Sequence, residues 1–145
     1  MQYLELIYFM EEQIPFNKYL GMKFIEVQND AVIMKLPFRE EFVGDPHRRA
    51  MHGGVLSSVM DVAGGTACWA SIGDIDARVS TVDMRVDFLL KGPCEDLICR
   101  AAVVRTGNRV AVARMELVGV SNPEQVVATG QAVYNIVKKN QKHKK

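Results

Sequence analysis

The twenty residues from His52 to Ser71, HGGVLSSVMDVAGGTACWAS, constrain the fold more than any other part of the chain. The run contains no proline, and small apolar residues recur in it every three or four positions, which predicts a helix that starts near Gly53 or Gly54. The apolar face of this helix carries Val55, Val59, Ala63, Ala67 and Ala70. One helix with such a face has to be covered by another element of the fold.

One carboxylate interrupts this helix. At about 100° per residue, Asp61 shares its side of the helix with five small residues, namely Ser57, Ser58, Gly64, Gly65 and Cys68. Each of the two interior glycines costs roughly 1 kcal/mol relative to alanine. Either a closely packed backbone or a ligand must therefore use the space that they leave.

The start of the helix, His52-Gly53-Gly54, is the second notable feature. Backbone N–H groups at the positive end of a helix dipole stabilise negative charge that develops on an oxygen. A carboxylate further along the same helix would complete a set of groups suited to acyl transfer. The alternative is a glycine turn before a buried helix, with Asp61 merely hydrogen-bonded.

The composition excludes several classes of protein. The chain has 145 residues, 48% hydrophobic and 24% charged, as expected for one globular domain. Five lysines lie in the last eight residues, and without them the net charge of +1 falls to about −4, which argues against a nucleic-acid surface. We expect one domain over residues 1–137 and a disordered lysine-rich tail over residues 138–145.

The cysteines and the N-terminus indicate a cytoplasmic protein. Cys68, Cys94 and Cys99 are odd in number and lack a metal-binding spacing, so we expect reduced thiols and no metal. Residues 1–10 are apolar, but Glu5 interrupts them and no basic residue precedes them, unlike a targeting signal. We find no stretch with the roughly 18 apolar residues that a transmembrane helix needs.

Short N-terminal helices and a series of strands account for the rest of the chain. An amphipathic helix to about Glu12 and a second helical segment, IPFNKYLG, from Pro15 to a stop at Gly21 are predicted first. Strands are predicted at 22–28, 31–36, 78–90, 96–106, 109–120 and 125–137, with a polar loop over 38–51. One long helix and about six strands predict an α+β fold, in which an antiparallel sheet rather than other helices wraps around the helix.

Residues 78–90 give the clearest strand pattern. Strict alternation places Val82, Met84, Val86, Phe88 and Leu90 on a buried face, and Thr81, Asp83, Arg85 and Asp87 on a polar face.

This order of elements resembles the hotdog-fold acyl-CoA thioesterases, in particular the branch that includes the phenylacetate-pathway thioesterase. The matching features are HGG at 52–54, Asp61 nine positions after the histidine, the segment Ser80-Thr81-Val82-Asp83-Met84, and IPFNKYLG. The resemblance covers roughly residues 14–137. It implies hydrolysis of an acyl-CoA thioester to a free carboxylic acid and CoA, with CoA as part of the substrate and no other cofactor.

The resemblance also implies residue roles. In this branch the residue that matches Asp61 is the catalytic carboxylate, acting as general base or nucleophile. The residue that matches Gly53 donates its backbone N–H to the thioester oxygen, and a serine or threonine that matches Thr81 helps to place the carboxylate or the water. Many members have an asparagine six residues before the histidine, in contact with the water, but this chain has Pro46 there.

Further candidates surround these residues. His52 either takes part in the chemistry or bonds the loop backbone and sets the helix start, and we favour the second reading. Gly54 and Ser57 are candidate substrate contacts. Arg105, Asn108 and Arg109, at a predicted Gly107-Asn108 hairpin, could bind the CoA phosphates, as could Arg48 and Arg49, although a solvated surface explains either pair equally well.

Two other functions remain open. One is hydration or dehydration of an acyl thioester, which needs a histidine beside an acid, and neither His47 nor His143 suits that role. The other is non-catalytic acyl-CoA binding, in which Asp61 would have no purpose. The eight methionines are read as core residues or as an adaptable acyl pocket.

The predicted sheet has two edges, and residues 78–90 are a candidate for pairing with a second copy, which predicts a homodimer or a dimer of dimers.

Gly53 and Asp61 lie roughly 12 Å apart along one helix. A thioester carbonyl is too small to reach both groups of one chain. We therefore expect each active site to take Gly53 from one subunit and Asp61 from the other.

Overall fold

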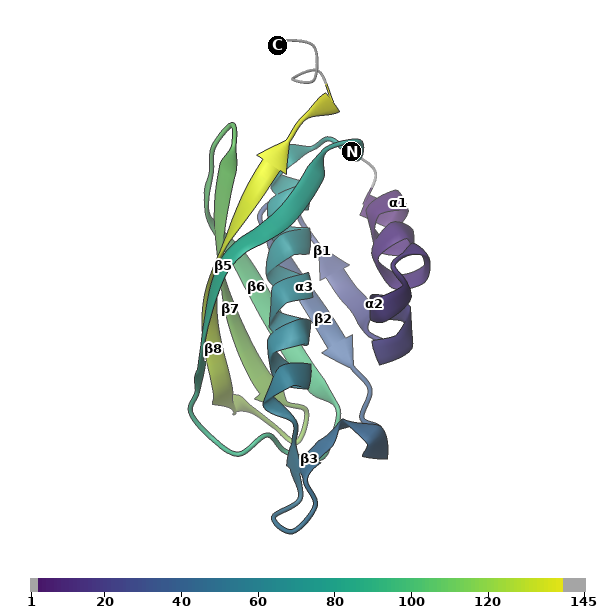
Figure 1. The fold of residues 1–145 in the computed structure, drawn as a ribbon, viewed down its shortest axis with the longest axis vertical. Coiled ribbons are helices and arrows are strands. Elements are labelled where there is room, and N and C mark those ends of the chain that lie inside the picture. The colour runs from purple at the N-terminus through teal and green to yellow at the C-terminus, as the bar shows by residue number, and fades with distance from the viewer. Residues whose placement is uncertain (1–2, 140–145) are drawn as a thin grey trace.

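A six-stranded antiparallel sheet curls around one long helix, α3 (Gly53–Ile72), in the computed structural model, which describes residues 3–139 (Figure 1). The strands are β1 (Lys23–Val27), β2 (Ala31–Leu36), β5 (Arg78–Phe88), β6 (Leu97–Thr106), β7 (Val110–Gly119) and β8 (Asn122–Val137). Their order across the sheet is β1-β2-β6-β7-β8-β5, so β1 and β5 are the two edges. The α+β hotdog fold with a central helix is confirmed.

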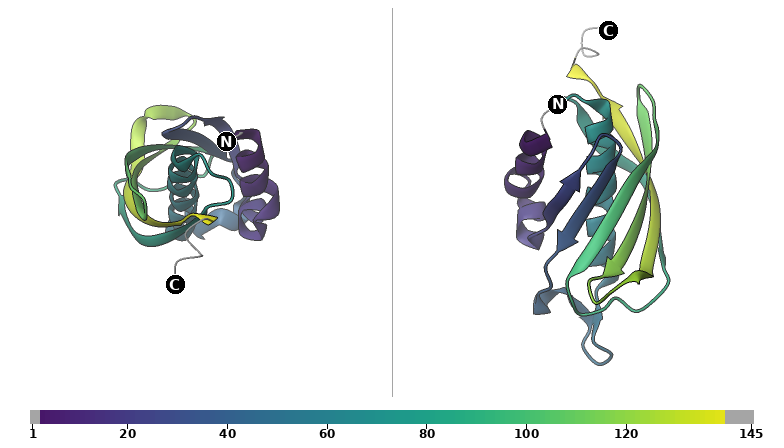
Figure 2. Two further views of the ribbon diagram at one scale, coloured as in Figure 1. Left: turned by 90° about the horizontal axis from the view of Figure 1, so that it is seen from above. Right: turned by 180° about the vertical axis from the view of Figure 1, so that it is seen from behind.

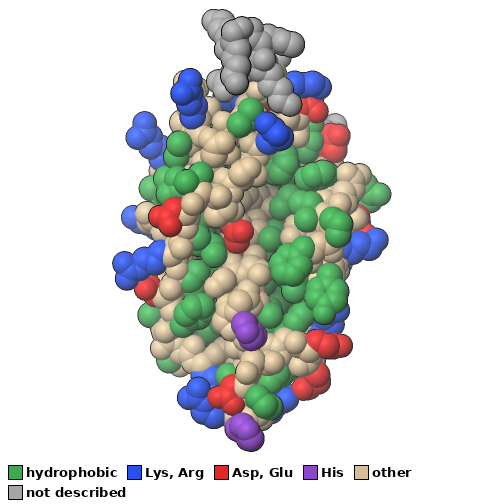
Figure 3. Space-filling view, viewed as in Figure 1, with side chains coloured by type: hydrophobic (Ala, Val, Ile, Leu, Met, Phe, Trp, Pro, Cys, Tyr) green, Lys and Arg blue, Asp and Glu red, His purple; other side chains and the backbone are tan. Residues whose placement is uncertain are grey.

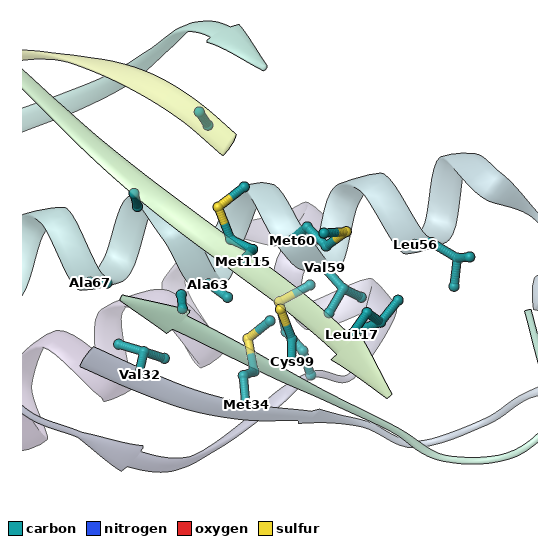
Figure 4. Close-up of a cluster of buried hydrophobic side chains, with 14 of the residues drawn as sticks. Val32, Met34, Leu56, Val59, Met60, Ala63, Ala67, Cys99, Met115 and Leu117 are labelled. Atoms are coloured by element: carbon teal, nitrogen blue, oxygen red, sulfur yellow. The ribbon is translucent and has the colours of Figure 1, made fainter. Parts of the chain in front are cut away.

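The core lies between α3 and the concave face of the sheet. Val59, Ala63 and Ala67 are fully buried there, and their small size lets the strands approach the helix closely. The side chains of Met34, Met60 and Met115 meet in the same layer (Figure 4), so these methionines are core residues. By length and composition α3 could also cross a membrane, contrary to our reading of the sequence, but half of its most apolar window is buried inside the fold.

Residues 3–20 form an N-terminal arm that lies against the side of α3 left open by the sheet (Figure 2). The arm comprises α1 (Tyr3–Tyr8), the π-helical turn η1 (Phe9–Gln13) and α2 (Pro15–Leu20), and Gly21 ends it with a φ of 74°. Leu6 and Met10 of the arm pack with Ala70 in a second buried cluster. The expectation that no other helix would cover α3 is therefore wrong, because one end of its apolar face turns toward the arm.

The predicted loop over residues 38–51 contains more structure than expected. It holds the 3-10 turn η2 (Glu40–Phe42) and a small hairpin of β3 (Val43–Asp45) and β4 (Ala50–Met51). A side chain on Gly44 would put its Cβ 2.6 Å from the His52 Cα atom, so only glycine allows this hairpin to pass so close to the start of α3. The hairpin thus fixes where the helix begins.

A β-bulge in β5 overturns the predicted alternation of that strand. Thr81 pairs with Tyr134 and Asp83 pairs with Val133, so Val82 is an extra residue without a partner in β8. Because of this insertion, Thr81 faces α3 instead of the polar side, and the Val82 side chain is 64% exposed instead of buried. The same face prediction fails for Phe88, which is exposed, and for Leu90, which lies beyond the strand.

Candidate active site

Asp61 lies in the middle of α3, half-buried, and β5 fixes its carboxylate. Thr81 Oγ1 donates a hydrogen bond to Asp61 Oδ1 at 2.7 Å. No described residue donates to the other carboxylate oxygen, Oδ2. The bulge at Val82 makes this contact possible because it turns the Thr81 side chain toward the helix. One oxygen of the carboxylate is thus held by the sheet, and the other accepts no hydrogen bond from the described residues.

Tyr134 of β8 binds the backbone of Asp61. Its hydroxyl donates to the backbone carbonyl of Asp61 at 2.9 Å, and burial raises its pKa, so it remains a donor. A Cβ on Gly64 would lie 2.5 Å from this hydroxyl, and one on Gly65 would lie 3.2 Å from the tyrosine ring. Of the two explanations for the glycine pair, close packing is the one that the structure supports, and the packed group is Tyr134.

At the start of α3, the N–H groups of Gly53 and Gly54 differ in their hydrogen-bond partners. His52 Nδ1 accepts a hydrogen bond from Gly54 N–H at 2.8 Å, so this side chain caps the helix. The His52 N–H donates to the Phe42 carbonyl at 2.8 Å, which ties the cap to the η2 turn. The Gly53 N–H has no acceptor among residues 3–139. Gly53, and not Gly54, is therefore the donor available to a ligand.

A pocket of about 150 Å³ opens beside Asp61, between the arm, α3 and β5. Its polar lining is Asp61, Thr81, Asn17 and Tyr134, and its apolar lining comes from Met10, Ile14, Val62, Trp69 and Val79. On this face of the molecule, hydrophobic side chains gather on both sides of the strip where α3 reaches the surface (Figure 3). The site therefore combines one carboxylate with apolar walls, as a site for an acyl group requires.

Sequence reasoning missed two polar residues of this pocket, Tyr134 and Asn17. Tyr134 is one apolar-looking position among many in the last strand, and only the register of β8 turns it toward Gly64 and Gly65. Asn17 belongs to the segment IPFNKYLG, which indicated a short helix but no polar contact. Neither residue has a local sequence signal that separates it from its neighbours.

Other candidates do not line the pocket beside Asp61. Ser57 is half-buried on α3 and does not line the pocket. Pro46 and His47 lie in the exposed loop between β3 and β4, so Pro46 is not in the Asp61 pocket either. Among residues 3–139, no three His, Cys, Asp or Glu side chains are grouped so that they could hold a metal ion.

The two arginine pairs differ in their partners. Arg48 Nε pairs with Asp45 at 2.7 Å, and Arg49 bonds Glu40 through two nitrogens, so both already have a carboxylate; these contacts lower the pKa of each carboxyl. Arg105 and Arg109 form no ion pair within residues 3–139. They line, with Asn108, a hollow of about 380 Å³ at the β6–β7 hairpin.

Comparison with known proteins identifies the family of this chain. Residues 49–124, about half of the chain, match the family described as the thioesterase superfamily. The chain belongs to the thioesterase superfamily. Within it, the Escherichia coli K12 protein YigI, a medium/long-chain acyl-CoA thioesterase, is 33% identical over 136 residues, which cover 85% of this chain and 86% of YigI.

Solved structures of the superfamily share the fold. A thioesterase-superfamily protein from Shewanella oneidensis is 29% identical, with a TM-score of 0.83 over 92% of this chain and 94% of its own. A thioesterase family protein from Silicibacter pomeroyi, at 24% identity, has a TM-score of 0.84 over 94% of this chain and 98% of its own, and shows the fold alone.

Proposed function

We propose that this protein hydrolyses an acyl-CoA thioester to a free carboxylic acid and CoA, with Asp61 as the catalytic carboxylate. The observation that carries the proposal is the Asp61 carboxylate itself, which Thr81 holds by one oxygen at the edge of an apolar pocket. The similarity to YigI, an acyl-CoA thioesterase, supports the same class of substrate.

In the proposed reaction, Asp61 acts as a general base on a water molecule, and a backbone N–H polarises the thioester carbonyl. Gly53 supplies this N–H, because it is the free donor at the positive end of the α3 dipole. His52 contributes by holding Gly54 and the start of the helix in place, not by proton transfer. Thr81 keeps Asp61 Oδ2 turned toward the reacting atoms.

We further propose that two chains build each site. Gly53 and Asp61 are eight residues apart on α3, a separation of about 12 Å along the helix axis, whereas a thioester carbon and its oxygen are little more than 1 Å apart. Two antiparallel helices across a two-fold axis would set each Gly53 opposite the other chain's Asp61. The edge strand β5 is free to pair with its copy, and Val82 and Phe88 expose apolar surface along it.

For the CoA phosphates we propose Arg105, Asn108 and Arg109. Arg105 and Arg109 form no ion pair with a carboxylate within the described residues, whereas Arg48 and Arg49 each form one. The hairpin that carries them is tied to the last turn of α3 by a 2.7 Å hydrogen bond between the Ser71 and Thr106 hydroxyls. Replacing Arg105 and Arg109 with alanine should raise KM for acyl-CoA. The same double variant should leave kcat unchanged on a substrate without the nucleotide, such as an acyl-pantetheine.

Neither alternative function has an observation in its favour. A hydratase or dehydratase needs a histidine that exchanges protons beside the acid, but the His52 Nδ1 atom is engaged in capping α3, His47 is exposed in a hairpin loop, and His143 lies outside the described residues. A binding protein without activity would have no use for a positioned carboxylate. Release of free thiol separates hydrolysis from the other two functions, because only hydrolysis liberates CoA.

The test is a thiol-release assay across acyl-CoAs of increasing length together with phenylacetyl-CoA. Asp61→Asn should lose at least 10²-fold in turnover, since a positioned general base contributes roughly 10²–10⁴-fold, and should still bind CoA. Preference for the phenylacetyl substrate would support the phenylacetate branch, and preference for longer chains would support likeness to YigI. Asp61→Asn with wild-type turnover would disprove the proposed mechanism.

A further inference from the structure

Asn17 is a buried polar residue for which the mechanism above has no role. Its side chain is 3% exposed, and Nδ2 donates to the Met10 carbonyl at 3.0 Å within the N-terminal arm. Thr66, the other fully buried polar residue of the described chain, donates to the Val62 carbonyl and needs no further partner. Asn17 differs because half of its amide is still unused.

The contact with Met10 fixes which way the amide points. An amide oxygen in the place of Nδ2 would face a carbonyl oxygen, so Oδ1 must be the atom turned away from Met10. No described residue donates to this Oδ1. Among residues 3–139, Arg39 Nε is the one fully enclosed side-chain atom without a partner, so the Asn17 oxygen is reached from the pocket and is not sealed.

The carboxylate and the amide of this pocket each leave one oxygen without a donor among the described residues. The Thr81 hydroxyl is donated to Asp61 Oδ1, and the Tyr134 hydroxyl is donated to the Asp61 backbone. The two oxygens without a donor are therefore Asp61 Oδ2 and Asn17 Oδ1. Both oxygens open on the same small pocket, so a molecule there that carries two donors on one atom can satisfy both of them, and water is such a molecule.

We propose that Asn17 Oδ1 and Asp61 Oδ2 together hold the nucleophilic water, which makes Asn17 a further catalytic residue. This inference rests on the hydrolysis proposed above and decides between the two possible roles of Asp61. A carboxylate that attacked the thioester directly would leave the Asn17 oxygen without a donor, whereas a carboxylate that acts as general base uses both acceptors.

The step balances as follows. The water oxygen forms a bond to the acyl carbon while one of its protons passes to Asp61 Oδ2, and its second hydrogen remains bonded to Asn17 Oδ1. The carbonyl electron pair moves onto the oxygen and then returns as the carbon–sulfur bond breaks. The sulfur leaves with that bonding pair and takes the proton from Asp61, giving CoA thiol and the carboxylic acid.

The test compares Asn17→Ala and Asn17→Asp with the wild-type chain. Asn17→Ala should lower kcat on the order of tenfold, as expected for one lost hydrogen bond, with little change in KM. Asn17→Asp keeps an acceptor but adds a carboxylate to a pocket whose titratable groups are Asp61 and Tyr134. Like charges hinder ionisation, so the acid limb of kcat/KM should move to higher pH, an effect that a purely structural residue would not produce.

Leu6→Ala is the matched control, because Leu6 anchors the same arm in the Ala70 cluster but does not line the pocket. Its Tm should fall further than that of Asn17→Ala while kcat, measured well below Tm, is kept. The inference is overturned if Leu6→Ala loses as much kcat as Asn17→Ala, if Asn17→Ala changes only KM, or if the acid limb of Asn17→Asp stays in place. Asp61→Asn run alongside separates the proposals: an active Asp61→Asn refutes the proposed hydrolysis, whereas an inactive Asp61→Asn with a fully active Asn17→Ala refutes only the role of Asn17.

Discussion

Two inactive variants of this protein should restore each other's activity, because each active site is proposed to draw on two chains. The first variant is Gly53→Pro, which removes the N–H at the start of α3 that has no acceptor within residues 3–139. Loss of one such donor costs about 10²–10³-fold in kcat. The second is Asp61→Ala, which removes the general base at a cost of roughly 10²–10⁴-fold. Each homodimer alone should therefore keep no more than about 1% of wild-type turnover.

The local structure suits this choice of variants. Gly53 is the first residue of α3, where proline is well tolerated, and the preceding residue, His52, has φ −63° and ψ 129°, an extended conformation compatible with a following proline. A Cβ at position 53 would lie 3.3 Å from the Phe88 ring, which is itself half exposed and can yield. Gly53→Ala makes the same contact but retains the N–H, so it should remain at least tenfold more active than Gly53→Pro.

When equal amounts of the two variants are unfolded and refolded together, about half of the dimers should be mixed. In a mixed dimer one site carries both lesions and the other carries neither. Roughly a quarter of wild-type activity should therefore return, at least 25 times the residual activity of either parent. If each site used Gly53 and Asp61 of the same chain, every site would contain one lesion. A refolded mixture that contains mixed dimers, counted by mass after tagging one parent, and yet stays inactive would refute the shared site.

Three further predictions concern packing and assembly. Light scattering at micromolar concentration should give twice the 16.2 kDa chain mass, or four times that mass for a dimer of dimers, and a monomer would contradict the pairing of β5. Gly64→Ala should destabilise the protein by up to about 2 kcal/mol in urea unfolding, because overpacking against Tyr134 and Met115 costs about 1–3 kcal/mol and the gain in helix propensity returns only about 1 kcal/mol. The same substitution should cost less in a Tyr134→Phe background, where the hydroxyl is absent; equal losses in the two backgrounds would show that the hydroxyl contact is unimportant. Burial raises the pKa of the Cys68 and Cys99 thiols to about 12, so a thiol reagent at pH 8 should modify at most Cys94 in the native protein and all three cysteines after unfolding.

The elements of this fold could be predicted because each has a local signal. The helical spacing from Val55 to Ala70, the stop at Gly21 and the Gly107-Asn108 hairpin all lie within a few residues of the structure that they determine. Some strand ends are as predicted and others differ by one to three residues: β8 begins at Asn122, three residues early, because the tight turn before it is at Val120 and Ser121. The existence and order of the elements thus follow from periodicity and turn residues.

What could not be predicted depends on contacts between distant residues. No glycine or proline in the sequence marks the bulge at Val82. The bulge is visible only in the register between β5 and β8. Alternation, a rule about one strand, therefore assigned Thr81 to the wrong face, while the family resemblance placed it beside the carboxylate, where it lies. The apolar residues Ile25 and Val104 occupy bulges of the same kind in β1 and β6 and are likewise exposed. In this sheet, a β-branched residue at a bulge is not evidence of a buried face.

The position of Asp61 is determined by the sheet more than by the helix that carries it. Its carboxylate is bonded by Thr81 of β5 and its backbone by Tyr134 of β8, and these two residues face each other across adjacent strands. This pair holds Asp61 at two points. Rotation of the side chain would break the bond to Thr81, and a shift of α3 along its axis would strain the bond to Tyr134. The glycines at 64 and 65 admit Tyr134 to this position, at a cost in helix propensity of roughly 1 kcal/mol each. The residues that lower the intrinsic stability of the helix are therefore the ones that allow the sheet to fix its carboxylate.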